Sequence, residues 1–243
     1  MQFPAQVLLD ATRRDATRPA LTFYDDTPEG HGERIEISRR VLRTWVAKAA
    51  NALQEGLDVA PGSVVLVQLP SPHWRLAYWA LAVWSVGATL TVDTQEGADV
   101  LVTTDPDSDL AEDCDEVVAV ALAGLARGFG DELRSGVMDE AAELSSYADE
   151  FIPWDDVEPD DTALVHGGER VAYADLLGDV GTVPDGARTL ITTTDPGLLV
   201  RQVLQVLAAD GSAVLVRGSA PGPHDARLDS EGVVHRCPEQ LRA

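Results

Sequence analysis

The sequence predicts an α/β fold with an open, mostly parallel, doubly wound sheet, helices on both faces and no C-terminal lid domain. Short apolar runs alternate along the chain with segments of helical periodicity, as in a sheet built from right-handed crossovers. The run VVLVQL at 64–69 is almost continuously apolar, which is typical of a strand buried on both faces. We expect one domain over residues 1–220 and a Gly/Pro-rich tail over residues 221–243, since a chain of 243 residues can bury a full core.

The first half of the chain carries clear signals for the ends of its helices. Pro4 suits a first helical position, and Ser38 is a good N-cap for a long amphipathic helix that Gly56 would stop. We expect helices over 4–16, 38–55 and 73–86, and strands over 20–24, 34–37, 64–69, 88–92 and 99–103.

The second half has weaker patterns and one conspicuous connector. We expect strands over 117–122, 162–165, 169–173, 188–193 and 212–217, a short strand within 232–236, and helices over 137–147, from 174, and over 196–209. Residues 149–161, DEFIPWDDVEPDD, read as an acidic surface loop.

The charge balance excludes several classes of partner. With 41 acidic and 18 basic residues the net charge is -23, so we expect no binding to nucleic acid or to anionic membranes, which require basic surfaces. No apolar run approaches the ~20 residues that span a bilayer, and the N-terminus lacks the basic start of a signal peptide. Two cysteines are too few for a disulfide framework, and we expect a cytoplasmic protein.

The usual catalytic and metal-binding residue types do not form recognisable constellations. The five histidines lack ligand spacing, so we expect no metal site, and the acidic stretches 105–116 and 149–161 lack the EF-hand pattern. Carboxylates beside Cys114 should raise its pKa, which disfavours a nucleophile. Ser71 precedes His73 by two residues, but an N-cap of the next helix is the preferred interpretation. We expect Trp74, Trp79 and Trp84 to pack in the core, because five-residue steps do not form one helical stripe.

Three segments resemble the opening of the acyl-adenylate-forming superfamily, which includes acyl-CoA synthetases. They are RPALTFYDD, GERIEISRRVLRTWVAKAANALQEGLDVAPGSVVLVQLP and SPHWRLAYWALAVWSVGATLTV. The segment RTLITTTDPGLLVRQVLQVLAADGSAVLVRG is similar to a later strand, helix and strand of that superfamily. The chain is therefore identified as a truncated, degenerate relative of an N-terminal AMP-binding domain, and the match consists mostly of packing residues, which carry fold rather than function.

The chemistry that this resemblance implies needs residues that the sequence does not supply. The superfamily uses a Ser/Thr/Gly-rich loop with a lysine for the ATP phosphates, a Tyr-Gly-x-Thr-Glu segment, a ribose-binding aspartate and a lysine on a separate C-terminal domain. No loop of the first kind occurs, and Lys48, the only lysine, lies inside a predicted helix. We therefore expect no cofactor and no catalytic residues.

The nearest candidate for a degenerate phosphate loop is His166-Gly167-Gly168, after the strand TALV. Two glycines after a strand can present backbone N–H groups to an anion. A tight hairpin turn is the preferred interpretation, because glycine readily adopts the positive φ that such turns require.

Two hypotheses about function follow. In the first, the protein is a non-catalytic module that binds a small molecule, in a crevice at the carboxyl ends of the strands, or a partner protein. In the second, it is an enzyme with altered acyl- or nucleotide-handling chemistry. The missing phosphate loop favours the first.

Overall fold

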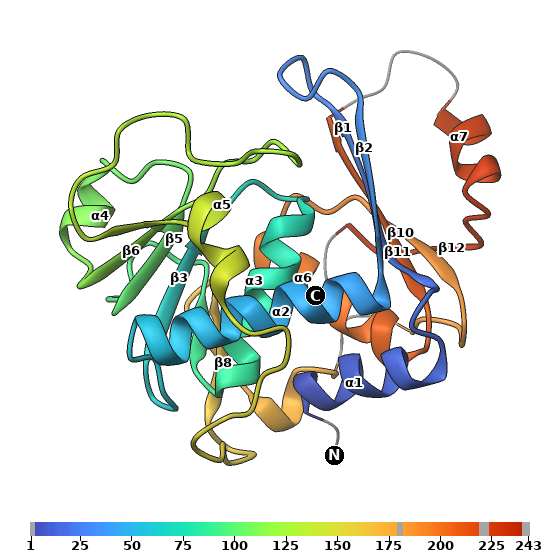
Figure 1. Cartoon of the computed structure of the whole chain (residues 1–243). Coiled ribbons are helices and arrows are strands. Elements are labelled where there is room, and N and C mark those ends of the chain that lie inside the picture. Colours follow the sequence, from blue (N-terminus) through green and yellow to red (C-terminus); the bar gives the residue numbers. More distant parts are fainter. Residues whose placement is uncertain (1–2, 179–181, 219–223, 240–243) are drawn as a thin grey trace. The chain divides into compact units, whose positions relative to one another are not determined.

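The computed structural model describes residues 3–178, 182–218 and 224–239, and it divides them into two compact units (Figure 1). Thr44–Leu69 and Tyr78–Leu176 form a unit with a seven-stranded sheet. The other described residues form a unit with a five-stranded sheet. The α/β class and the mostly parallel strands are confirmed, whereas the expected single sheet is wrong, because two separate sets of strands pair. One domain over residues 1–220 stays a prediction, since two compact units can still unfold together.

The five-stranded sheet has the order β12-β10-β11-β1-β2. Its strands are β1 (Pro19–Asp26), β2 (Glu33–Ser38), β10 (Arg188–Ile191), β11 (Ser212–Gly218) and β12 (His235–Arg236). All neighbours are parallel except β2, which pairs with β1 as an antiparallel hairpin at one edge. The helices α1 (Pro4–Arg14), α6 (Pro196–Ala208) and α7 (His224–Ser230) belong to this unit.

Local signals fixed two helix starts in this unit as expected. Ser38 Oγ accepts the Val41 N–H at 3.3 Å, so Ser38 caps α2 (Arg39–Asn51). Asp195 accepts the Leu198 N–H at 2.8 Å, and Pro196 occupies the first turn of α6.

Residues 224–239, within the range expected as a tail, form α7 and β12 of the five-stranded unit, and β12 lies in the short strand expected within 232–236. Leu228 of α7 lies in an apolar cluster with Tyr24, Leu190 and Val214, and β12 extends the sheet alongside β10. Glu231 accepts hydrogen bonds from Tyr24, Arg34 and Arg188. Apolar burial and charge-assisted hydrogen bonds thus tie this segment to the unit.

A buried arginine joins three parts of the five-stranded unit. The Arg39 side chain has no exposed surface. Its Nη1 donates to the Ala11 carbonyl at 2.9 Å and to Asp210 Oδ1 at 2.8 Å, and its Nη2 donates to the Asp210 carbonyl at 2.7 Å. The end of α1, the start of α2 and the turn before β11 are therefore held by one guanidinium.

The seven-stranded sheet has the order β7-β6-β5-β3-β4-β8-β9. Every neighbouring pair is parallel except β8 and β9, which form an antiparallel edge hairpin. The strands are β3 (Val64–Gln68), β4 (Thr89–Thr91), β5 (Val100–Thr103), β6 (Glu116–Ala119), β7 (Val137–Asp139), β8 (Thr162–His166) and β9 (Glu169–Ala172).

The helices of this unit include most of α2, which runs on into a π-helical turn (Ala52–Gly56), and most of α3 (Trp74–Val86). Short helices occur at α4 (Asp109–Glu112), α5 (Glu140–Glu143), Leu144–Ser146 and Tyr173–Asp175. Figure 1 shows α5 beside the blue α2. None of the helices in the described ranges combines the length and apolar content that a membrane crossing requires.

The helix expected over residues 137–147 is wrong at its start. Val137 and Met138 pair with Val117 and Val118 of β6, so this stretch is strand β7. Asp139 then caps α5, accepting from the N–H of Ala141 at 3.1 Å. Strand pairing outweighs the helical pattern here, because β7 completes the edge of a buried sheet.

Candidate functional site

The parallel strands β3, β4 and β8 of the seven-stranded unit are neighbours and end at the same edge of the sheet. An open hollow of about 490 Å³ lies at this edge. Gln68 at the end of β3 donates to the Val92 carbonyl at 3.2 Å. The Val92 N–H donates to the Val165 carbonyl of β8 at 3.4 Å. The carboxyl edge of a parallel sheet is where open α/β folds bind ligands, so this hollow is the candidate site. It is lined by Gln68, Val92, Asp93, Thr94, Gln95, Glu96, Gly167 and Gly168.

The His166-Gly167-Gly168 segment forms the predicted two-stranded hairpin turn. His166 pairs with Glu169, and Gly167 and Gly168 between them have φ angles of 61° and 77°. Two successive positive φ angles define a tight type I′ turn, which favours glycine at both positions. The hairpin places both glycines in the wall of the hollow, whereas ligand binding by His166, Gly167 and Gly168 stays a prediction.

The two glycine N–H groups converge on an anion that the chain itself supplies. The Gly167 N–H donates to Asp93 Oδ1 at 3.1 Å, and the Gly168 N–H donates to Asp93 Oδ2 at 2.9 Å. Asp93 comes two residues after β4, which lies next to β8, so the two loops meet at one edge. The Asp93 carboxylate thus accepts both hydrogen bonds from the glycine N–H groups, which could otherwise bind a phosphate oxygen.

The charge of the hollow opposes a second anion. Asp93 and Glu96 are its charged lining residues, and the lining within the described ranges contains no lysine or arginine. Arg170, on the strand that leaves the turn, pairs with Glu96 at 3.0 Å and is exposed. The geometry therefore suits a neutral or cationic ligand better than a polyphosphate.

Lys48, the only lysine, serves the connector after α5 rather than this hollow. Its Nζ donates to the carbonyls of Ser145, at 2.9 Å, and Tyr147, and pairs with Asp149 at 2.8 Å. The side chain is 15% exposed. An ammonium held by three oxygens is already neutralised and positioned, and this arrangement is structural.

The Ser71 and His73 pair is not a catalytic dyad in this structure. His73 Nδ1 accepts the Arg75 N–H at 3.1 Å and so caps α3, a role that we expected of Ser71. Ser71 Oγ instead faces the Thr193 carbonyl at 3.5 Å. Burial, reinforced by the charges of Arg75 and Arg217, lowers the His73 pKa to about 3, so the imidazole is neutral and remains an acceptor.

The remaining candidates fit structural roles. Burial, followed by the carboxylates of Asp113 and Asp115, raises the pKa of the Cys114 thiol, in the direction that the sequence predicted. Burial raises the pKa of Cys237 to about 11. Trp74, Trp79 and Trp84 are all buried, at 3% exposure or less, as expected of core residues.

Sequence reasoning missed Asp93, which is the residue that defines the site. Its available signal was an acidic residue directly after an apolar strand, at the edge where the next parallel strand also ends. The position of Asp93 beside the glycine turn follows only from the pairing of β4 with β8, two strands that lie far apart along the chain.

The chain matches no protein-family model. Its similarity to one curated protein is extensive: a "TIGR03089 family protein" of Mycobacterium tuberculosis is 32% identical over 238 residues, which cover 91% of this chain and 92% of that protein.

Solved structures share the fold at low sequence identity. An acyl-CoA synthetase of Brucella canis aligns with a TM-score of 0.71 and 22% identity over 95% of this chain. An acetoacetyl-CoA synthetase of Streptomyces lividans aligns with a TM-score of 0.74 and 20% identity over 96%. Coronafacic acid ligase of Pectobacterium brasiliense aligns with a TM-score of 0.69 and 12% identity over 95%. The chain spans 46%, 42% and 47% of these proteins, so it has the fold of less than half of an acyl-CoA synthetase, in accord with the resemblance.

Proposed function

The chain belongs to the TIGR03089 family, and from that premise we propose that it is a non-catalytic binding module on the acyl-CoA synthetase fold. In this role it does not form acyl-adenylates. It binds a small molecule at the carboxyl edge of its seven-stranded sheet, or a partner protein.

One observation carries the proposal: the carboxylate of Asp93 holds both N–H groups of the Gly167-Gly168 turn. A phosphate-binding turn needs these donors free, because catalysis of phosphoryl chemistry depends on donors aimed at the charge that develops. An internal carboxylate at the same donors competes with a phosphate and repels it. The turn is therefore built as a closed structural element.

The ion pairs of Lys48 and Arg170 also support a non-catalytic role. Adenylation develops negative charge on the α-phosphate and on the pyrophosphate, and loss of one stabilising donor costs about 10²–10³ in rate. Lys48 is committed to the connector, and Arg170 pairs with Glu96. The hollow is left with a net negative lining, which selects against MgATP.

The direct test is carboxylate-dependent ATP–pyrophosphate exchange, with a panel of fatty, aryl and amino acids and an authentic acyl-CoA synthetase as positive control. We expect exchange at the level of the no-protein blank. Exchange above that level that survives further purification and disappears with a substitution at the hollow would establish the second candidate, an enzyme with altered chemistry.

A companion measurement identifies the kind of ligand. Thermal unfolding is measured with ATP, AMP, coenzyme A and fatty acids, each with and without Mg²⁺, and with neutral long-chain alcohols and cationic long-chain amines. A ligand that binds only the folded state must raise the Tm. A neutral or cationic compound that raises the Tm, and loses this effect when Asp93 is replaced, supports the binding module. A large shift with MgATP contradicts it.

A further inference from the structure

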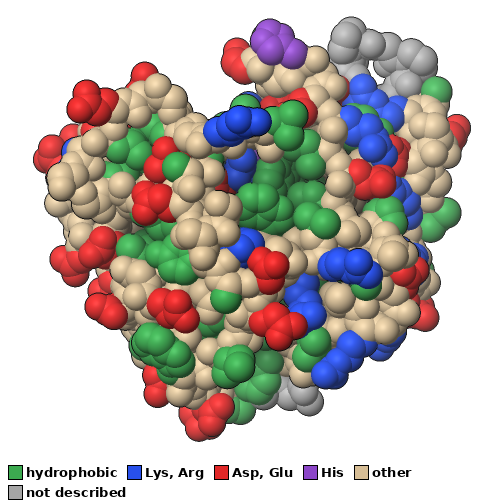
Figure 2. Space-filling model, in the orientation of Figure 1, with side chains coloured by type: hydrophobic (Ala, Val, Ile, Leu, Met, Phe, Trp, Pro, Cys, Tyr) green, Lys and Arg blue, Asp and Glu red, His purple; other side chains and the backbone are tan. Residues whose placement is uncertain are grey.

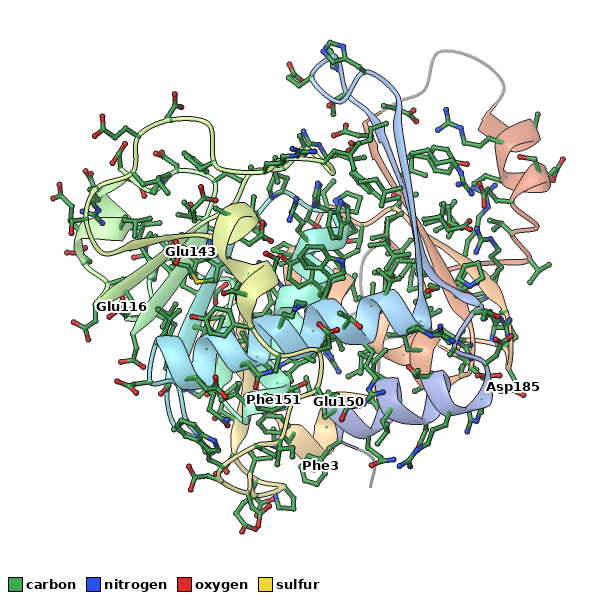
Figure 3. The ribbon with its side chains drawn as sticks, viewed as in Figure 1. Phe3, Glu116, Glu143, Glu150, Phe151 and Asp185 are labelled. Atoms are coloured by element: carbon green, nitrogen blue, oxygen red, sulfur yellow. The ribbon has the colours of Figure 1, made fainter. Side chains whose placement is uncertain are left out.

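The acidic connector, residues 149–161, lies against one side of α2 and the π-helical turn that follows. The stretch between the short helix Leu144–Ser146 and β8, all of it described, contains neither helix nor strand. Figure 3 shows Glu150 and Phe151 of this connector alongside the blue α2. Its course is nevertheless set by side chains of that helix.

Three polar side chains, three residues apart, hold the connector and the residues just before it. Lys48 binds two carbonyls ahead of the connector and the carboxylate of Asp149. Asn51 Nδ2 donates to the carbonyls of Ala148, at 3.1 Å, and Glu150, at 2.9 Å. Gln54 Nε2 donates to the Ile152 carbonyl at 3.2 Å, and its Oε1 accepts the Trp154 N–H at 3.0 Å. Residues at this spacing share one face of a helix, so together they form a continuous seat for an extended chain.

The connector presents two large hydrophobic side chains to solvent. Ile152 is 78% exposed and Trp154 is 66% exposed, whereas Trp74, Trp79 and Trp84 are buried. The Gln54 amide binds the backbone on both sides of Pro153, so the two side chains are anchored close together. Tryptophan is enriched at the energetic centres of protein interfaces, and a preordered anchor loses little further entropy on binding.

Within the connector itself, all the charged side chains are acidic. Residues 149–161 include seven carboxylates and no basic residue: Asp149, Glu150, Asp155, Asp156, Glu158, Asp160 and Asp161. Figure 2 shows acidic side chains lying among hydrophobic ones over the lower part of this face, where Lys and Arg side chains also occur. A connector of this composition attracts basic partners and repels acidic ones.

We propose that the acidic connector is a docking surface for an arginine-rich protein segment, with Trp154 and Ile152 as its apolar anchors. This inference names the partner class of the binding role proposed above and rests on it. Arginine fits best, because its guanidinium stacks on an indole face while it donates to carboxylates in the same plane. The chain itself contains such a stack, with the Arg75 guanidinium 4.5 Å from the Trp74 ring centroid.

The test uses the full chain and a fluorescein-labelled peptide of alternating arginine and leucine, with fluorescence anisotropy at low and moderate salt. We expect measurable binding that weakens about tenfold in Trp154→Ala, since interface tryptophans commonly contribute at this level. The double variant Asp155→Asn/Asp156→Asn should bind more weakly and with a shallower salt dependence. Peptide binding should also protect Trp154 from acrylamide quenching.

Matched variants outside the connector separate docking from general attraction to a protein of charge -23. Leu125 is 94% exposed, and Asp107 and Glu112 are exposed carboxylates of the same unit. Leu125→Ala and Asp107→Asn/Glu112→Gln should leave the affinity unchanged. Equal losses in these controls, no effect of Trp154→Ala, or no binding at all would overturn the docking proposal. None of these outcomes alters the adenylation assay, so the two proposals fail separately.

Discussion

Replacing Asp93 by alanine should loosen the turn and open its donors to an external anion. The change removes two hydrogen bonds, of 3.1 and 2.9 Å, from glycine N–H groups to a carboxylate. Hydrogen bonds to charged groups contribute about 1.5–3 kcal/mol each when buried, but both glycines are exposed and water replaces the lost acceptor. We therefore expect a loss of about 1–2 kcal/mol, or about 2–8 °C in Tm for a chain of this size.

The same variant should bind inorganic pyrophosphate more tightly than the wild type. Removing a unit charge about 4 Å from a bound anion relieves between about 1 kcal/mol at the dielectric constant of water and about 4 kcal/mol at an effective value of 20. The lower figure alone corresponds to about fivefold in Kd. Isothermal titration calorimetry at low ionic strength measures the affinity, and thermal unfolding measures the stability.

Two controls bracket this prediction. Asp93→Asn keeps one acceptor oxygen without the charge. It should therefore lose less stability than Asp93→Ala and gain less pyrophosphate affinity over the wild type than Asp93→Ala does. Leu125→Ala, at an exposed residue of the same unit that does not line the hollow, should change neither property. An Asp93→Ala protein with unchanged Tm and unchanged pyrophosphate affinity would refute the view that this carboxylate closes the turn.

Three further outcomes are expected. Arg39→Ala should cost about 3–5 kcal/mol in urea unfolding, because it breaks an ion pair with Asp210 whose arginine is fully buried and removes that arginine's hydrogen bonds to backbone carbonyls. Arg14→Ala, 3.6 Å from the same Asp210 but 55% exposed, should cost less than about 1 kcal/mol, and similar costs for both variants would contradict the buried role of Arg39. Burial raises the Glu231 pKa, but hydrogen bonds from tyrosine and arginine outweigh it and lower that pKa from 4.5 to about 2. Because the folded-state pKa is depressed, the stabilisation is complete above pH 4.5 and is lost as the pH falls towards 2; Glu231→Gln should flatten the unfolding free energy over that window, and an unchanged pH profile would count against it. Gln54→Ala should speed cleavage of the acidic connector by a glutamyl endopeptidase about tenfold, since two hydrogen bonds to its backbone are lost, and equal cleavage rates would show that the seat does not restrain it.

Local chemistry predicted most of the individual elements. Ser38 and Pro196 marked helix starts, and Gly167 and Gly168 marked a turn, because each of these residues acts through its own backbone or through a group a few positions away. The strand β7 at Val137 was missed, since its stabilisation comes from pairing with β6 and not from its own pattern. The division into two sheets was missed for the same reason: alternation of strands and helices does not say which strands pair.

Of the candidate site, only the turn at Gly167 and Gly168 could be predicted from the sequence. Their role depends on Asp93, which lies more than seventy positions earlier in the chain and is brought to them by the pairing of β4 with β8. Likewise no pattern in the sequence assigned a role to Asn51 or Gln54, and both are in fact buried. Their role comes from contacts with a connector about a hundred positions away along the chain.

The solitary lysine gives this molecule a natural chemical reporter. Apart from an α-amino group, Lys48 is the one primary amine of the chain, so an amine-directed acylating reagent or an acetyltransferase has a single side chain to modify. Acylation removes its positive charge, and with it the attraction to the Asp149 carboxylate. The extent of acylation at this position, read by mass spectrometry, therefore reports how often the connector leaves its seat, with no label introduced into the protein.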